Sequence, residues 1–160
     1  MAGLIKPDED SAKVTFPPPF IYLGTLLLGL GIDWLLDLSL PLAMPLRIAG
    51  LAVFGLAGLA IGLSANMRFT RAGTDVKPWK ASSTIVREGA FRFTRNPMYL
   101  GMALLYVGLA VGLASISALV LLPILLLVIQ TQVIAREERY LEAKFGDEYR
   151  SYKAAVRRWI

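Results

Sequence analysis

Cysteine and histidine are both absent from this chain of 160 residues. Without cysteine, neither a disulfide framework nor a thiolate zinc site can form. Without histidine, the chain also lacks the commonest general base near neutral pH and the commonest metal ligand. Any chemistry must therefore depend on carboxylates, arginine, lysine, tyrosine, asparagine and backbone groups, or on a cofactor.

Charged residues are also scarce: they make up 18% of the chain, whereas 56% of the residues are hydrophobic. A soluble domain of this size needs more polar residues on its surface, so the composition indicates a protein of the lipid bilayer. A helix crosses the hydrocarbon with about 20 mainly apolar residues. Four stretches fit or nearly fit this length, at residues 19–40, 46–67, 97–113 and 116–135. We therefore predict an all-α, polytopic membrane protein with four transmembrane helices, which forms one membrane domain over residues 1–160.

The basic residues predict how these spans are oriented. Of the 17 lysines and arginines, two precede the first span, seven lie in residues 68–95 and seven in residues 136–158; only Arg47 falls on the other side. Cytoplasmic connections carry the excess of positive charge. We therefore expect an integral, multi-pass protein with cytoplasmic N- and C-termini. The N-terminal tail, residues 1–18, has mixed charge and is not expected to be a removed signal peptide, because no small-residue cleavage site follows the first apolar run.

Small residues indicate how the spans pack. Residues 114–117 leave room only for a tight turn, so the third and fourth spans are expected to be antiparallel neighbours. Gly58 and Gly62, and likewise Gly108 and Gly112, have the spacing that lets helix backbones approach closely. We expect them to serve packing within the chain in preference to a dimer interface.

Asp33 and Asp37 lie near the outer end of the first span. A carboxylate within the membrane is a functional candidate, and one alternative for the whole chain is a small transporter that uses Asp33 for coupling. Counting about 1.5 Å per residue from Pro19 places Asp33 close to the outer interface. An interfacial position is therefore favoured over a functional one.

The connection between the second and third spans, residues 66–96, is long enough to be functional or disordered. It contains Trp79, Phe91 and Phe93, which can hold it against the membrane surface, so we expect it to be ordered. It ends at Asn96 and Pro97, which suit the N-cap and first position of the next helix. The polar residues of this region therefore also have a purely structural explanation.

The C-terminal segment begins with two adjacent acids, Glu137 and Glu138. Acids at a helix C-terminus oppose the helix dipole, so nearby arginines or a bound cation should compensate. Further on, Gly146 is expected at a helix C-cap and Asp147 at the next N-cap.

Beyond that break, aromatic and apolar residues recur at helical spacing among basic ones. They are Tyr149, Tyr152, Val156 and Trp159. The pattern predicts a short amphipathic C-terminal helix that lies on anionic lipid.

Two motifs together resemble a known family. The first is G-A-F-R-F-T-R-N-P-M-Y-L-G, residues 89–101; after a hydrophobic hairpin comes E-E-R-Y-L-x-x-x-F-G-x-E-Y-x-x-Y, residues 137–152. This series resembles the isoprenylcysteine carboxyl methyltransferase and phospholipid methyltransferase superfamily, whose members carry an Arg-His-Pro-x-Tyr-x-Gly element and a paired-glutamate element. The resemblance covers residues 66–160. It implies a membrane enzyme with S-adenosyl-L-methionine in a cytosolic pocket and a lipophilic small molecule or a lipid as acceptor.

The resemblance also implies roles for individual residues. Those implied to bind the cofactor are Gly89, Phe91, Arg95, Asn96, Pro97, Tyr99, Gly101 and Glu138. Arg95 would pair with the cofactor carboxylate, and Tyr99 would pack on the adenosyl part or donate its hydroxyl. Glu137 or Glu138 would bind the ammonium or ribose, and Glu138 is favoured. The catalytic candidates are Glu137, Arg136 and Arg158, of which the two arginines would orient an anionic acceptor. Membrane lipids are the other expected partners, and neither a metal nor a nucleic acid is implied.

Asn96 departs from the family element, which has histidine at this position. An amide can keep a hydrogen bond to the cofactor, but it cannot act as a base near neutral pH. If the histidine of the family only holds the cofactor, activity survives the replacement. If it deprotonates an amine or thiol acceptor, this chain needs a carboxylate acceptor or another base, or it binds the cofactor without turnover.

Overall fold

The computed structural model describes residues 7–160, and every regular element in them is helical. The elements are α1 (Pro18–Leu36), α2 (Met44–Arg71), the 3₁₀ helix η1 (Gly89–Arg92), α3 (Pro97–Gly112), α4 (Ile116–Val128), the π-helical turn η2 (Ile129–Ile134), α5 (Ala135–Phe145) and α6 (Asp147–Ala155). The all-α prediction is thus confirmed for this part of the chain. Residues 1–6 of the expected N-terminal tail lie outside it.

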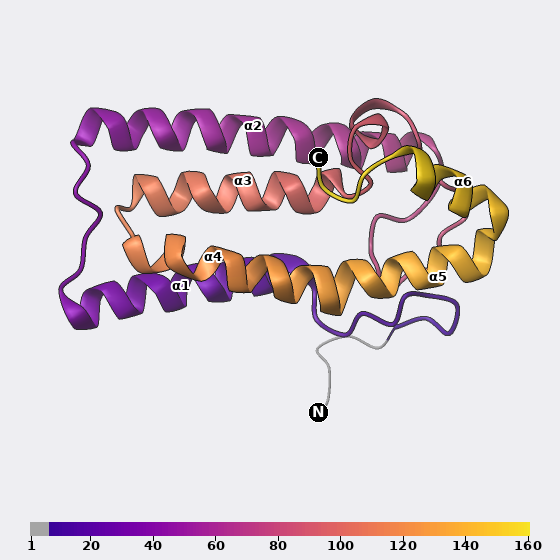
Figure 1. Cartoon of the computed structure of the whole chain (residues 1–160), viewed down its shortest axis with the longest axis horizontal. Helices are drawn as coiled ribbons and strands as arrows, with labels where there is room; N and C mark the ends of the chain where they lie inside the picture. Colours follow the sequence, from indigo (N-terminus) through magenta and orange to yellow (C-terminus); the bar gives the residue numbers. More distant parts are fainter. Residues whose placement is uncertain (1–6) are drawn as a thin grey trace.

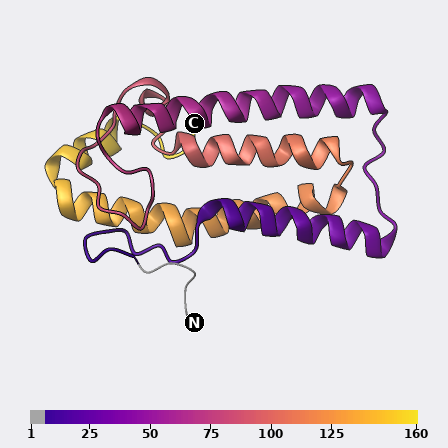
Figure 2. The same ribbon diagram turned by 180° about the vertical axis from the view of Figure 1, so that it is seen from behind.

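Helices α1 to α4 lie along one another, with α3 packed on α2 and α4 packed on α1 (Figures 1 and 2). α4 continues through η2 into α5, so one unbroken helix runs from Ile116 to Phe145. This helix, α1 and α2 are long and apolar enough to cross a membrane. α3 is apolar but shorter, with 16 residues. The structure therefore has three helices of spanning length where the sequence predicted four spans.

Two of the predicted boundaries move for local reasons. α1 ends at Leu36 and not near residue 40, because Asp37 adopts a left-handed conformation with φ of 51°. α2 continues to Arg71, past the predicted residue 67, and the arginines in its last turn are favourable at a helix C-terminus. The long connection is therefore limited to residues 72–96.

Glycines allow α2 and α3 to approach closely. A Cβ on Gly58 would lie 2.5 Å from the carbonyl oxygen of Gly101, and a Cβ on Gly101 would lie 2.8 Å from the carbonyl oxygen of Gly58. A Cβ on Gly108 would lie 2.9 Å from the backbone nitrogen of Gly55. The expectation that Gly58 and Gly108 serve packing within the chain is confirmed.

Asp33 is buried where α1 meets the start of α4. Its carboxylate accepts hydrogen bonds from Ser115 Oγ at 2.5 Å and from the backbone N–H of Ser117 at 3.1 Å. Ser115 is itself the N-cap of α4 and accepts from the N–H of Ala118 at 3.1 Å. Asp33 is therefore an internal support of the α3–α4 turn, at the end of the bundle, and its expected depth near the outer interface stays a prediction. Both of its oxygens have partners, so it does not resemble the free carboxylate that a transporter would need.

The N-terminal segment, the long connection, α5 and α6 gather at the opposite end of the bundle (Figure 1). The predicted break at Gly146 is confirmed: this residue has φ of 55° and separates α5 from α6. Gly146 is also the N-cap of α6, and Asp147 is its first residue, not the expected N-cap.

The apolar face of α6 contacts the protein itself. Tyr149 and Tyr152 are buried, and the hydroxyl of Tyr152 donates to the carbonyl of Phe91 at 2.8 Å. The helix ends at Ala155, before Val156 and Trp159. The prediction that this face lies on anionic lipid is therefore wrong, because the long connection occupies it.

Candidate active site

Two cavities adjoin at the end of the bundle that carries the long connection. One, with about 700 Å³ of space that includes its opening to solvent, is lined by charged, aromatic and apolar side chains, so we call it the polar cavity. The other, with about 650 Å³ measured in the same way, is lined mainly by apolar side chains, and we call it the apolar cavity. They share a set of lining residues: Phe69, Val76, Lys77, Pro78, Phe91, Arg95, Asn96 and Glu137. The shared residues make the two cavities neighbours across one common wall.

The polar cavity has walls from five parts of the chain, of which α2 contributes Phe69. The long connection contributes Lys77 and Lys80, α5 contributes both paired glutamates and Tyr140, and α6 contributes Tyr149 and Tyr152. The N-terminal segment contributes Ala12, which is buried. This segment is held in place because Asp8 pairs with Lys80 at 3.3 Å and Asp10 pairs with Lys144 at 2.5 Å.

The apolar cavity lies towards the membrane-spanning helices. Its lining comes from the first residues of α1, from Trp79 in the long connection and from the first two turns of α3. The α3 residues are Pro97, Met98, Tyr99 and Met102. Such a lining suits an apolar molecule whose polar end reaches the shared wall.

Glu137 lies in that shared wall. Its Oε1 accepts a hydrogen bond of 2.6 Å from the hydroxyl of Tyr99. Glu137 belongs to the charged helix α5, beyond the apolar part of the long C-terminal helix, which ends near Ile134. Burial raises the pKa of Glu137 to about 7, the bond from Tyr99 opposes this rise, and the charge of Glu138 adds to it. A carboxylate with such a pKa can accept or release a proton near neutral pH.

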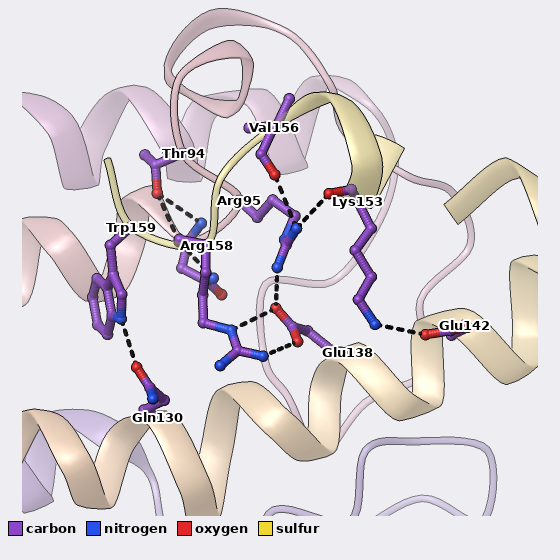
Figure 3. A network of polar contacts seen from close by, with 10 residues as sticks. Thr94, Arg95, Gln130, Glu138, Glu142, Lys153, Val156, Arg158 and Trp159 are labelled. Atoms are coloured by element: carbon purple, nitrogen blue, oxygen red, sulfur yellow. Dashed lines mark hydrogen bonds and ion pairs between the residues drawn. The ribbon is translucent and has the colours of Figure 1, made fainter. Parts of the chain in front are cut away.

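Glu138 has different surroundings, shown in Figure 3. It is buried, and its Oε1 accepts from Arg95 at 2.8 Å and from Arg158 Nε at 3.0 Å, while its Oε2 accepts from Arg158 at 2.5 Å. Burial alone would raise the pKa of Glu138, but the hydrogen bonds from Arg158 and Arg95 outweigh it and hold the pKa below its usual value. Both oxygens have cationic partners, as the compensation of adjacent acids requires. The direct contact with a cofactor ammonium or ribose that was expected of Glu138 would need one of these bonds to open.

Arg95 is also largely occupied by the protein. One terminal nitrogen donates to the carbonyls of Lys153 at 2.7 Å and Val156 at 2.9 Å, and the other binds Glu138. Among residues 7–160, its Nε is the one buried side-chain polar atom without a hydrogen-bond partner. Arg95 lines both cavities. The protein uses three of its five N–H donors, so the Nε–H and one N–H of the terminal nitrogen that binds Glu138 remain for a ligand. The expected pairing of Arg95 with the cofactor carboxylate stays a prediction.

Asn96 and Pro97 begin α3 as predicted, but the side chain of Asn96 does not cap the helix. Its Nδ2 donates to the carbonyl of Arg158 at 2.9 Å. The hydroxyl of Thr94 donates to the same carbonyl at 3.1 Å, and the backbone N–H of Arg95 donates to the carbonyl of Arg157 at 2.9 Å. The first motif therefore binds the segment that follows α6, residues 156–160, which we call the C-terminal tail.

The π-helical turn η2 precedes the paired acids. Turns of this kind contain one residue more than an α turn and are frequent at functional sites, since they rotate the residues that follow around the helix axis. Gln130 in this turn accepts a hydrogen bond of 3.0 Å from the indole N–H of Trp159 in the C-terminal tail. The tail is thus attached both to the first motif and to the helix that carries the acids.

A family model described as phospholipid methyltransferase matches residues 46–148, almost two thirds of the chain. The chain belongs to this family. The match contains the first motif and the paired acids, so the resemblance predicted from those residues is confirmed. An uncharacterized protein of Haemophilus influenzae (strain ATCC 51907 / DSM 11121 / KW20 / Rd) is 49% identical over 63 residues, which are its whole length and 39% of this chain. No solved structure matches the chain significantly.

Four residues that the motifs suggested do not line either cavity of this phospholipid methyltransferase family member: Gly89, Gly101, Arg136 and Arg158. Gly101 lies in the contact between α2 and α3, and Gly89, with φ of 62°, lies beside the side chain of Arg68. Arg136 contacts Gln132 at 3.3 Å and the carbonyl of Lys13 at 3.5 Å. Phe91, Pro97 and Tyr99 do line a cavity.

Several residues of the site were not predicted from the sequence. Lys77, Tyr140, Tyr149 and Tyr152 line the polar cavity, and Thr94 binds the C-terminal tail. The spacing of the tyrosines on α6 was the available signal, but helical spacing does not tell a face that packs on protein from one that packs on lipid. Nothing in the sequence indicated that the tail returns to the first motif.

Proposed function

We propose that the protein transfers a methyl group from S-adenosyl-L-methionine to a lipophilic acceptor held in the membrane. One observation carries this proposal: a polar cavity and an apolar cavity meet at Glu137. A charged, water-soluble cofactor and a molecule from the bilayer can then bind on either side of one wall. Holding two reactants together in this way is a large part of what a methyltransferase must do. Membership of the phospholipid methyltransferase family supports the same reaction and a lipid as the acceptor.

The residues of the polar cavity fit the cofactor. The unpartnered Nε–H of Arg95 suits its carboxylate, and the rings of Phe91, Tyr149 and Tyr152 suit the adenine and a positively charged sulfur. When bound, the cofactor supplies a methyl group on a sulfonium, which is already activated for displacement. The remaining work of the chain is to orient the reactants and exclude water from the wall between them.

Glu137 is the proposed proton acceptor. A lipid amine or a thiol carries a proton that must leave when the methyl group is added, and the Glu137 carboxylate lies where the apolar cavity reaches the wall. Tyr99 orients this carboxylate through its hydrogen bond. Glu137 thus takes the place of the base that is lost with asparagine at position 96, whereas a carboxylate acceptor would need no base at all.

We further propose that α3 is a fourth membrane crossing. It lies along α2 over most of its own length, and the turn at Ala114 connects it to the start of α4 (Figure 2). Its 16 residues give a length of about 24 Å, which a slightly thinner bilayer around the protein can accommodate. With four crossings, both termini and the basic segments lie on the cytoplasmic side.

Calorimetric titration of the detergent-purified protein with S-adenosylhomocysteine tests the cofactor site. The next step is transfer of a radiolabelled methyl group from the cofactor into a total lipid extract. Binding together with label in the lipid supports the proposal. No binding at hundreds of micromolar by a monodisperse protein overturns it, and binding without transfer identifies a cofactor-binding relative that lacks turnover.

A further inference from the structure

The C-terminal tail lies outside the residues that the family model matches, which end at 148. It nevertheless occupies the centre of the network in Figure 3. Four backbone carbonyls of residues 153–158 accept hydrogen bonds from the first motif, and Trp159 binds Gln130. These contacts determine where Arg158 can reach. Its guanidinium makes two hydrogen bonds to Glu138 and is about one third exposed.

We propose that Arg158 is a positioning residue: carried to the site by the C-terminal tail, it holds the Glu138 carboxylate beside the wall and leaves Glu137 as the carboxylate that meets the reactants. This inference rests on the proposed function. It gives Arg158 a different role from the one that the resemblance implies, which is to orient an anionic acceptor. In the structure, Arg158 lines neither cavity, and its charged end is directed at Glu138.

The physical reason is the proximity of two negative charges. Glu137 and Glu138 are adjacent at the start of α5, and each ionised carboxylate makes ionisation of the other less favourable. Arg95 neutralises Glu138 in part through one hydrogen bond. Its two other side-chain hydrogen bonds go to the carbonyls of Lys153 and Val156. Arg158 provides the second positive charge. Without it, more of the negative charge of Glu138 acts on Glu137, and Glu138 is free to turn into the polar cavity.

Other titratable groups surround Glu137. They are Tyr99 on α3, Glu138 and Tyr140 on α5, Tyr149 and Tyr152 on α6, and Arg95, Asp75, Lys77 and Lys80 from the connection before α3. Among them only Glu138 is hydrogen-bonded to the Arg158 side chain, so a change in the titration of Glu137 in an Arg158 variant reports the loss of the Arg158–Glu138 pair.

The test is the pH–rate profile of methyl transfer to the lipid extract for the full chain and three variants. In Arg158→Gln, we expect the acidic limb to move to higher pH by about one unit, together with a higher KM for the cofactor. Arg158→Lys keeps the charge and should restore most of the limb. Arg139→Gln is the matched control: Arg139 follows Glu138 directly, is exposed, and has no side-chain partner among residues 7–160. Its profile should match that of the native chain.

A second measurement does not depend on turnover. The thermal midpoint of unfolding in detergent, measured against pH, is compared between Glu137→Gln and the native chain, and then between the same pair carrying Arg158→Gln. Within each pair, the difference between the two midpoints changes with pH as Glu137 titrates. This change should occur at higher pH in the pair that carries Arg158→Gln. A native chain that transfers no methyl group overturns the proposed function, and the melting curves still decide on Arg158. Coincident melting curves and coincident rate profiles overturn the positioning role. If Arg158→Gln does not fold, Arg158→Met, which also removes the charge, takes its place and is judged by the same criteria.

Discussion

The hydroxyl of Tyr99 donates a 2.6 Å hydrogen bond to Glu137 at the wall between the polar and apolar cavities. Tyr99 belongs to the first turn of α3 and Glu137 to the first turn of α5, so this bond joins the two sequence motifs in space. The neighbouring Glu138 is directed at Arg95 and Arg158 instead. Two adjacent glutamates therefore differ in their surroundings: Glu138 is held by two arginines, and Glu137 lines both cavities.

Replacing Glu137 by glutamine should remove the proton acceptor while keeping the shape of the wall. We expect methyl transfer to a lipid amine to fall by about 10²–10⁴-fold, the range for loss of a general base, with binding of S-adenosylhomocysteine changed much less. Glu9→Gln is the control, because Glu9 is exposed and lies away from both cavities. Full activity in Glu137→Gln would show that the acceptor needs no base, as with a carboxylate.

The same substitution should change how stability depends on pH. The pKa of Glu137 is raised in the folded protein from about 4.5 to about 7, so its ionisation opposes folding. This penalty is absent below about pH 4.5, grows through the window up to about 7, and is complete above it. Glu137→Gln should therefore be more stable than the native chain at pH 8 and equal to it at pH 4.5. The difference should be at most about 3 kcal/mol, and less because Glu137 keeps contact with the cavities.

The measurement is unfolding in detergent at several pH values, with Glu9→Gln as the matched variant. A native chain whose stability relative to Glu137→Gln is the same at pH 5 and pH 8 would contradict the raised pKa. A gain in stability that accompanies a loss of activity is the usual sign of a residue kept for function.

The sequence predicted the main helices but not the polar contacts between them. Apolar runs and the Asn96-Pro97 start predicted α3 to within a residue, because local propensity determines a helix start. The two motifs predicted the family because they follow each other in a recognisable order. The contacts of Arg95 with the C-terminal tail could not be predicted, since they join residues about sixty positions apart and depend on how α6 turns back. The partner of Asp33 could not be predicted for the same reason, since Ser115 is distant in the sequence.

Replacing Tyr99 by phenylalanine should remove the hydroxyl that stabilises ionised Glu137. The bond opposes the effect of burial on the pKa of Glu137, so its loss should raise that pKa further. We expect the acidic limb of the pH–rate profile to move up by about one unit, since a hydrogen bond to a charged group contributes about 1.5–3 kcal/mol. The bond from Tyr22 to the carbonyl of Tyr99 is unaffected. An unchanged profile would mean that Tyr99 serves only packing.

Replacing Asn96 by histidine introduces the residue that the family element has at this position. In this chain Asn96 donates to the carbonyl of Arg158, and one imidazole N–H can make the same bond. We therefore expect Asn96→His to keep methyl transfer within a few fold, whereas Asn96→Leu should loosen the C-terminal tail and lower activity. A large gain in activity in Asn96→His would instead show that the native chain lacks a base, which Glu137 was proposed to supply.

Replacing Gly101 by alanine distinguishes a role of this residue in the cofactor site from a role in helix packing. A Cβ at this position would lie 2.8 Å from the carbonyl of Gly58 and 3.0 Å from the nitrogen of Gly62, both of which belong to backbone that cannot yield easily. Gly101→Ala should therefore push α3 away from α2 and cost about 1–3 kcal/mol of stability. Gly62→Ala is the matched control, because a Cβ at position 62 meets nothing within 4 Å. We expect a lower melting midpoint for Gly101→Ala alone, and an unchanged affinity for S-adenosylhomocysteine in the protein that remains folded; loss of that affinity at a normal melting midpoint would place Gly101 in the cofactor site after all.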